Sequence, residues 1–198
     1  MDSIKAVGGL QWAVGKMHTA CCQLPTAHCP LPTAYCQLPT ADYLYNMKIL
    51  MVCLGNICRS PIAEGILQEK AKKAGLNWHI ESAGTNGYHT GEPPHQLSIK
   101  VAGVNGIDIS KQRSRRFIAD DFENYDLIYA MAADVLEDMR SIAGKHFDEK
   151  KVRLFLEESF PGENKEVPDP WYGAEDGYHE AFEIINCNCD FIIKKFTK

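Results

Sequence analysis

The stretch KILMVCLGNICRSPIAEG, residues 48–65, passes from an apolar segment into a helical pattern through a loop with two cysteines and an arginine. The apolar run that follows Lys48 is continuous, which is typical of a strand buried on both faces of a parallel sheet. Next, Ser60 has the character of an N-cap, Pro61 suits a first helical position, and Gly75 provides a stop. The stretch therefore predicts a strand, a loop and a helix in direct succession.

The same alternation continues along the chain. Apolar runs predict three further strands, at residues 77–84, 125–131 and 150–157. Helical patterns begin at residue 96, with an end near Gly103 or Gly106, and occupy residues 132–144 and 175–196. Strands that alternate with helices predict an α/β sandwich, with a mostly parallel sheet and helices on both faces. Ligands bind such folds at the carboxyl ends of the strands, so the loop after the first strand is the expected site.

Composition narrows the class of protein. A formal net charge of -5 without a Lys/Arg run argues against nucleic-acid binding. No segment approaches the ~18 apolar residues that a membrane span needs, so no membrane insertion is expected. Because the N-terminus lacks the pattern of a signal peptide, we expect a cytoplasmic protein. The eight cysteines are not spaced like a disulfide framework, which favours free thiols.

Residues 1–46 differ from the rest of the chain. They contain the heptads CQLPTAH, CPLPTAY and CQLPTAD in succession, and the proline in each excludes a coiled coil. The segment is a disordered low-complexity arm, a metal-binding tract, or the translation of a DNA repeat upstream of the true start. We favour the misassigned start, because Met47 opens a natural first strand. Residues 47–198 then form one domain.

The loop after the first strand has the composition of an anion site. Backbone N–H groups converge there, and the helix dipole adds positive charge. Gly55 permits a tight path, Asn56 can pin the loop or adopt positive φ, and Arg59 offers a planar fork for two phosphate oxygens. Cys53, at the end of the strand, would lie beneath the bound anion as a thiolate nucleophile. Ser60 could stabilise that thiolate when it departs as a leaving group.

The motifs VCLGNICRSP (52–61), ESAGT (81–85), GEPP (91–94), GIDIS (106–110) and PDPWYG (168–173) resemble, in order, the low-molecular-weight protein tyrosine phosphatases. The resemblance runs from residue 47 to 198 and makes this segment a phosphatase domain. It implies a flavodoxin-like three-layer sandwich with a four-stranded parallel sheet, no metal and no organic cofactor. Cys53 is the implied nucleophile, Arg59 the phosphate clamp and Asp169 the general acid. The implied phosphate-binding and supporting positions are Leu54, Gly55, Asn56, Ile57, Cys58 and Ser60.

The segment around Asp169 fits aryl phosphate chemistry. A carboxylic acid over the phosphate site can protonate the leaving phenol, and Pro170 stiffens its loop. Trp171 and Tyr172 offer walls for a phenyl ring, with Tyr88 as a candidate for the opposite wall. We therefore expect hydrolysis of phosphotyrosyl proteins through a phosphocysteine intermediate.

Several alternatives stay open. A protein arginine phosphatase or an arsenate reductase has the same scaffold, although the apolar Ile57 favours phosphotyrosine over phosphoarginine. A non-catalytic phosphate-binding module is a third alternative. Cys58 either forms a reversible disulfide with Cys53 or is a packed residue. Two positions depart from the family pattern, since Ala132 and His95 stand where acidic residues are usual. Oligomeric state is left open.

Overall fold

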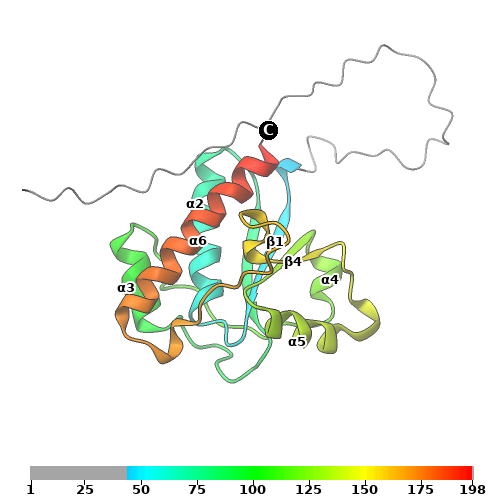
Figure 1. The fold of residues 1–198 in the computed structure, drawn as a ribbon, viewed down its shortest axis with the longest axis horizontal. Coiled ribbons are helices and arrows are strands. Elements are labelled where there is room, and N and C mark those ends of the chain that lie inside the picture. The colour runs from blue at the N-terminus through cyan, green and yellow to red at the C-terminus, as the bar shows by residue number, and fades with distance from the viewer. Residues whose placement is uncertain (1–43, 198) are drawn as a thin grey trace, which may run out of the picture. The chain divides into compact units, whose positions relative to one another are not determined.

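The computed structural model describes residues 44–197 (Figure 1). Most of the segment 1–46, for which disorder or a misassigned start was predicted, lies outside this part of the chain. Within it, four parallel strands form one sheet in the order β2-β1-β3-β4. The strands are β1 (Lys48–Cys53), β2 (His79–Gly84), β3 (Leu127–Ala130) and β4 (Val152–Leu154). The predicted parallel sheet is confirmed, and its order places β1 at an interior position.

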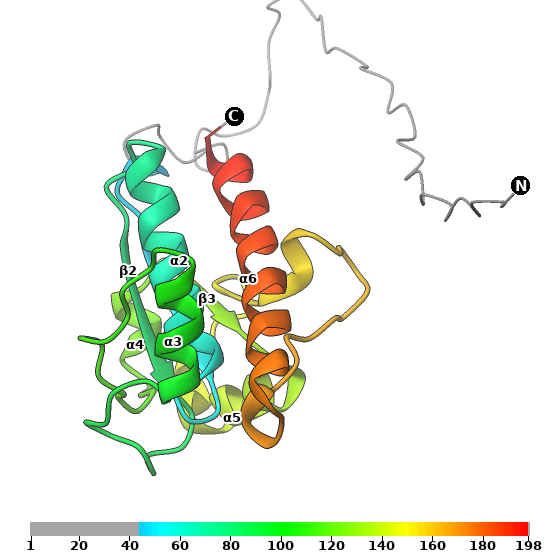
Figure 2. The ribbon, with the colours of Figure 1, turned by 90° about the vertical axis from the view of Figure 1, so that its left-hand side faces the viewer.

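Helices cover both faces of the sheet. The helices are α2 (Arg59–Lys73), α3 (Gln96–Val104), α4 (Asp121–Asn124), α5 (Ala133–Ala143) and α6 (Glu175–Phe196), with 3-10 turns η1 (Gly144–His146), η2 (Phe155–Glu158) and η3 (Pro170–Tyr172). Helices α2, α3 and α6 lie together on one side, and α4 and α5 lie on the other (Figures 1 and 2). This confirms the three-layer sandwich. No helix within residues 44–197 combines the length and the apolar character that crossing a membrane requires.

Strand β1 divides its side chains between two cores. Ile49, Met51 and Cys53 belong to the cluster beneath α2 and α6, whereas Leu50 and Val52 belong to the cluster beneath α5. All five are buried. Successive side chains of a strand point to opposite faces, so a strand covered on both sides needs a continuous apolar run.

Helix α2 begins two residues earlier than the sequence pattern suggests. Its N-cap is Cys58, so the prediction of Ser60 as the N-cap is wrong. The Ser60 hydroxyl instead contacts the Cys53 sulfur at 3.0 Å, and this contact turns it toward the loop. The stop at Gly75 is confirmed: φ is 73°, and its N–H donates to the Lys72 carbonyl in a Schellman-type ending.

The last strand is shorter than predicted. β4 ends at Leu154, and the chain turns into η2, where the backbone carbonyl of Phe155 accepts a hydrogen bond from Asn188 of α6 at 2.6 Å. The predicted extension of this strand to residue 157 is therefore wrong, because a side chain of the final helix binds the backbone that would have continued it.

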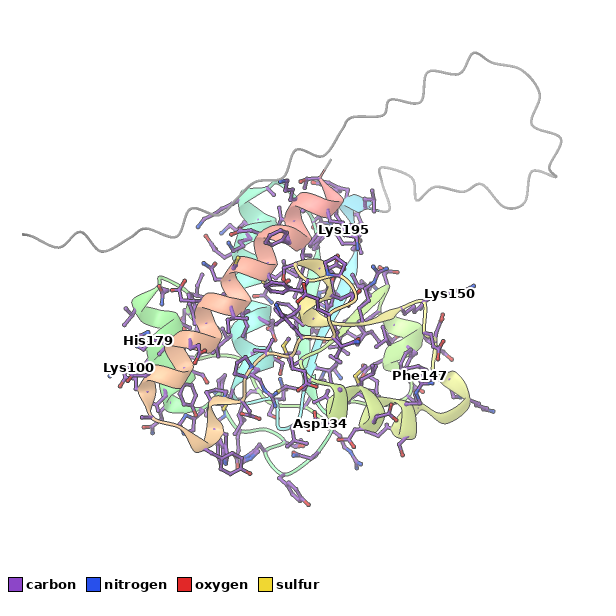
Figure 3. All side chains as sticks on the ribbon, in the orientation of Figure 1. Lys100, Asp134, Phe147, Lys150, His179 and Lys195 are labelled. Atoms are coloured by element: carbon purple, nitrogen blue, oxygen red, sulfur yellow. The ribbon has the colours of Figure 1, made fainter. Side chains whose placement is uncertain are left out.

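Polar contacts fix the ends of helix α6. Lys100 of α3 reaches the carboxylate of Glu175 at 2.7 Å, and His179 lies 3.7 Å from the same group, so both side chains meet near the start of α6 (Figure 3). At the other end, Lys195 contacts Glu158 of η2 at 2.6 Å. The start of α6 is thereby held beside α3, close to the segment that carries η3.

Candidate active site

The loop formed by residues 54–58 joins the end of β1 to α2 and is held by Asn56. This residue has a φ of 55°, in the left-handed region that asparagine tolerates better than most residues. Its side-chain amide donates to Ser60 at 3.0 Å and to Ser82 at 2.8 Å, and its carbonyl accepts the N–H of Arg115 at 2.9 Å. Both roles predicted for Asn56, positive φ and pinning of the loop, are present.

The residues that follow the neighbouring strand β2 support the same loop. The N–H of Thr85 donates to the Cys53 carbonyl, and that of Asn86 donates to the Leu54 carbonyl, each at 3.0 Å. Gly84 permits this close approach, because a Cβ at that position would lie 2.9 Å from the Leu54 carbonyl oxygen. The loop is therefore built on two adjacent strand ends.

The sulfur of Cys53 lies at the base of the loop. The residue is only 3% exposed, and its sulfur accepts the N–H of Asn56 at 3.2 Å. With the Ser60 hydroxyl also 3.0 Å away, two groups surround the sulfur that can donate hydrogen bonds to a thiolate. These two contacts hold the sulfur at the base of the loop.

Arg59 is the first residue of α2, and its guanidinium is bound by the distant segment that precedes α6. One terminal nitrogen lies 2.5 Å from the Asp169 carboxylate, and the other donates to the Val167 carbonyl at 3.3 Å. Arg59 is 5% exposed. Planar donors fixed in this way present a defined fork to a tetrahedral oxyanion.

Asp169 caps the short turn η3. One of its oxygens accepts the N–H of Trp171 at 3.1 Å, while the other faces Arg59. The Asp169 side chain keeps 34% of its surface exposed, and Pro170 beside it is buried. A carboxylate oriented in this way can exchange a proton with a ligand above the loop.

These groups converge on one cavity of about 270 Å³. Ser60 lies behind the loop and does not line it. The lining residues are Cys53, Leu54, Gly55, Ile57, Cys58, Arg59, Asn86, Tyr88, His89, Asp169, Trp171 and Tyr172. The structure thus brings the predicted nucleophile, clamp, acid and aromatic walls together.

Two lining residues, Asn86 and His89, were not predicted from the sequence. They follow β2, and the carboxyl ends of adjacent parallel strands meet at one edge of a sheet. Their position directly after the second predicted strand was the sequence signal that could have placed them at the site. His89 packs close to the loop, because a Cβ on Gly55 would lie 3.2 Å from its ring.

The aromatic walls differ in exposure. Tyr88 and Tyr172 are 86% and 93% exposed, whereas Trp171 is 43% exposed. Trp171 is thus the aromatic wall with the most extensive packing against the protein. The two tyrosines project from the rim, where a bulky substrate can contact them.

Cys58 is buried beside Tyr178, whose hydroxyl lies 3.7 Å from the sulfur. Burial raises the pKa of the Cys58 thiol to about 12, although the hydrogen bond from Tyr178 acts in the opposite direction. Cys58 is therefore a protonated thiol near neutral pH, unlike the form required of a nucleophile. Its disulfide with Cys53 remains a prediction.

The two departures from the family pattern, Ala132 and His95, both lie at helix starts. The N–H of Ala133, at the start of α5, donates to the carboxylate of Glu166 at 2.8 Å, although the N-cap residue Ala132 has no side-chain acceptor. His95 is the N-cap of α3, and its Nδ1 accepts the N–H of Leu97 at 3.3 Å. Both helix starts are capped by side chains that the family pattern did not indicate.

Glu64 lies behind the loop on α2. The Ser82 hydroxyl, which accepts a hydrogen bond from Asn56, donates to the Glu64 carboxylate at 2.6 Å. Burial raises the pKa of Glu64 to about 7, and the hydrogen bond from Ser82 partly offsets this effect. A chain of hydrogen bonds therefore connects a titrating carboxyl group with the loop.

Comparison with known proteins agrees with this geometry. Residues 48–198 match the family model described as low molecular weight phosphotyrosine protein phosphatase. The protein of that name from Schizosaccharomyces pombe is 36% identical over 151 residues, which make up 74% of this chain and 96% of the relative.

Solved structures extend the comparison to the fold. The crystal structure of a protein tyrosine phosphatase from Entamoeba histolytica, with Hepes in its active site, gives a TM-score of 0.69 at 34% identity over 75% of this chain and 96% of that chain. The structure of the arginine phosphatase YwlE, a Bacillus subtilis protein, gives a TM-score of 0.70 at 26% identity, over 77% of this chain and 97% of that chain. Because the family model spans all four strands and the helices that cover them, this chain belongs to the low molecular weight phosphotyrosine protein phosphatase family.

Proposed function

We propose that this enzyme hydrolyses phosphotyrosine in protein substrates, and simpler aryl phosphates, through a phosphocysteine on Cys53. The observation that carries the proposal is the convergence of Cys53, Arg59 and Asp169 on one cavity of about 270 Å³ with aromatic walls. A module that only binds phosphate has no need of a thiol at the base of the cavity and a carboxylate over its mouth.

In the first step, the Cys53 thiolate attacks phosphorus in line with the tyrosyl oxygen. The S–P bond forms as the P–O bond to the phenol breaks, and Asp169 transfers its proton to the departing oxygen. The Asn56 N–H and the Ser60 hydroxyl hold the sulfur in position before the attack.

Negative charge spreads over the three equatorial oxygens in the transition state. The backbone N–H groups of the 54–58 loop and the guanidinium of Arg59 are the donors for these oxygens. Arg59 is buried, and its contacts with the Val167 carbonyl and the Asp169 carboxylate fix the guanidinium beside the loop. Preorganised donors of this kind supply much of the stabilisation in phosphoryl transfer.

In the second step, water attacks the phosphocysteine while Asp169, now ionised, accepts a proton from it. The new P–O bond forms as the S–P bond breaks, which releases inorganic phosphate and returns the sulfur to its thiolate form. The Ser60 hydroxyl, 3.0 Å from the sulfur, stabilises the departing thiolate.

The cavity lining favours an aromatic substrate. Trp171, Tyr172 and Tyr88 provide ring surfaces at the mouth, and the buried Ile57 adds an apolar contact within the loop. A phosphoarginine guanidinium is polar and cationic, so these residues suit it less well than a phenyl ring. We infer that the enzyme acts in the cytoplasm, because the four cysteines of the described part of the chain are free thiols and the nucleophile requires reducing conditions.

The test is phosphate release by the full-length protein from matched phosphotyrosyl, phosphoarginyl and phosphoseryl peptides, with Cys53→Ser as the control variant. We expect the phosphotyrosyl peptide to be hydrolysed fastest. We expect Cys53→Ser to fold with the same melting temperature but show no turnover, and acid quenching of the wild type to trap a phosphorylated Cys53. Preference for phosphoarginine would overturn the substrate assignment, and near-wild-type turnover by Cys53→Ser would overturn the nucleophile.

A further inference from the structure

The aromatic wall residue Trp171 contacts two histidine rings. Its ring lies 5.5 Å from that of His95, edge to face at 69°, and 5.8 Å from that of His89, tilted at 55°. Trp171 is 43% exposed, and the two ring contacts are part of the packing that holds the indole against the protein. It also lies two residues after Asp169 in the sequence and donates its backbone N–H to that carboxylate.

The two histidines differ in how they are held. His89 lines the cavity, and its Nδ1 lies 2.8 Å from the exposed carboxylate of Glu92. His95 does not line the cavity. Its ring is stacked on Tyr178 at 5.3 Å with an interplanar angle of 17°, and Tyr178 is fully buried in α6. His95 therefore connects the indole to the rigid core, whereas His89 is anchored at the surface.

Backbone contacts fix His95 from two further elements. Its N–H donates to the Ile57 carbonyl of the 54–58 loop at 2.8 Å, and its Nδ1 accepts the N–H of Leu97 at the start of α3. The imidazole thus has two separable tasks. In the first, one ring nitrogen accepts a hydrogen bond at the start of α3, and a carboxylate can accept this bond equally well. In the second, the ring packs between Tyr178 and Trp171, which a carboxylate cannot do.

We propose that His95 is a positioning residue that holds Trp171 against the substrate, so that it sets how tightly the site binds the aromatic part of a phosphate ester. This inference rests on the proposed function, and it assigns the aromatic preference to a residue outside the cavity. The proposed phosphate donors are the loop and Arg59, and the His95 backbone, not its ring, donates the hydrogen bond to the Ile57 carbonyl of that loop. Removing the imidazole ring should therefore weaken aryl ester binding and leave phosphate binding unchanged.

Two substitutions separate the tasks of His95. His95→Asp keeps an acceptor for the start of α3 and removes the ring, whereas His95→Phe keeps a ring and removes the acceptor. The assays are KM for phosphotyrosine and for an alkyl phosphate, the inhibition constant of inorganic phosphate, and the melting temperature.

For His95→Asp we expect KM for phosphotyrosine to rise about two- to tenfold, the strength of one aromatic pair. KM for the alkyl phosphate and the phosphate inhibition constant should stay at wild-type values. For His95→Phe we expect a wild-type KM and a melting temperature lower by about 2–4 °C, the effect of a lost helix cap. An unchanged KM for phosphotyrosine in His95→Asp, or an equal rise in the phosphate inhibition constant, would overturn the inference.

A second measurement does not depend on turnover. Acrylamide quenching of tryptophan fluorescence, compared in the wild-type and Trp171→Phe backgrounds, isolates the signal of Trp171. We expect His95→Asp to increase the quenching constant in the wild-type background and not in the Trp171→Phe background. If His95→Asp changes the quenching constant equally in both backgrounds, or in neither, the positioning role is contradicted. If no phosphate ester is hydrolysed at all, the proposed function fails, and the quenching result still decides whether His95 holds Trp171.

Discussion

The guanidinium of Arg59 and the carboxylate of Asp169 lie 2.5 Å apart, although 110 positions separate them in the sequence. This contact joins the start of α2 to the segment before η3, so that the proposed phosphate clamp and the proposed acid share one location. The pair also fixes the orientation of the Asp169 carboxylate, because one oxygen faces Arg59 and the other accepts the Trp171 N–H. The contact therefore orients both groups before a substrate arrives.

Asp169→Asn removes the transferable proton and keeps the shape of the side chain. Because a poor leaving group needs that proton more than an activated one, we expect kcat to fall about 10²–10⁴-fold with phenyl phosphate. With p-nitrophenyl phosphate the loss should be much smaller. The measurement is kcat for a series of aryl phosphates of rising leaving-group pKa. Equal losses across the series would contradict the general-acid role.

Arg59→Lys tests the geometry of the clamp. Lysine keeps the positive charge but loses the planar fork that contacts both Asp169 and the Val167 carbonyl. We expect kcat/KM for p-nitrophenyl phosphate to fall about 10²–10³-fold, the loss typical of one preorganised donor to a transition-state oxygen. The control is circular dichroism with the melting temperature. A variant that keeps wild-type kcat/KM would show that charge alone is sufficient.

Asn56 has two roles that different substitutions separate. Asn56→Gly keeps access to positive φ and loses the side-chain bonds to Ser60, Ser82 and Arg115, while Asn56→Ala loses both. We expect both variants to lose activity, and Asn56→Ala to be less stable than Asn56→Gly by about 1 kcal/mol because its backbone is strained. Urea unfolding measures the difference, and equal stability would argue against strain at this position.

The sequence predicts the architecture well because the fold depends on local patterns. The continuous apolar run of β1 is covered on both faces, and the pattern over residues 175–196 matches the observed bounds of α6. The cysteine loop also carries its own signal, since the residues that shape it are neighbours in the chain. These predictions require no knowledge of distant contacts.

The remaining features depend on segments that meet only in the folded protein. Ser60 is not the N-cap, because its hydroxyl contacts the Cys53 sulfur instead of a backbone N–H of the helix. Strand β4 ends early because the Asn188 side chain donates a hydrogen bond to the backbone beyond it. The sequence patterns also did not predict that His95 and Glu166 accept backbone N–H groups at helix starts. In each case a tertiary contact overrides or replaces the local pattern.

The carboxylate of Glu166, which lies outside α5, accepts the N–H of the first residue of that helix. Glu166→Ala leaves the Ala133 N–H without this carboxylate, so we expect a loss of about 1 kcal/mol in the free energy of unfolding. Adding Ala132→Asp places an acceptor at the N-cap itself and should restore the loss. Urea unfolding of the single and double variants provides the test. Failure of Ala132→Asp to compensate would indicate that Glu166 stabilises the protein by another route.

The raised pKa of Glu64 makes stability depend on pH. Burial raises this pKa from 4.5 to about 7, so the folded protein binds a proton that the unfolded chain has released in that interval. The stability that Glu64 contributes is fully present below pH 4.5 and is lost as the pH rises through about 7. Glu64→Gln removes this dependence, and we expect it to be more stable than the wild type by about 2 kcal/mol at alkaline pH, with little difference at acid pH.

The measurement is the free energy of urea unfolding at about pH 5 and about pH 8, with Glu69→Gln on the same helix as the matched control. Glu69 is paired with the exposed Lys73 at 3.3 Å, a contact that is worth little at the surface. The control variant should therefore follow the wild type at both pH values. If Glu64→Gln also follows the wild type, the Glu64 carboxyl group is not the source of the pH dependence. If it is less stable at both pH values, the ionised carboxylate stabilises the loop through Ser82 more than its burial costs.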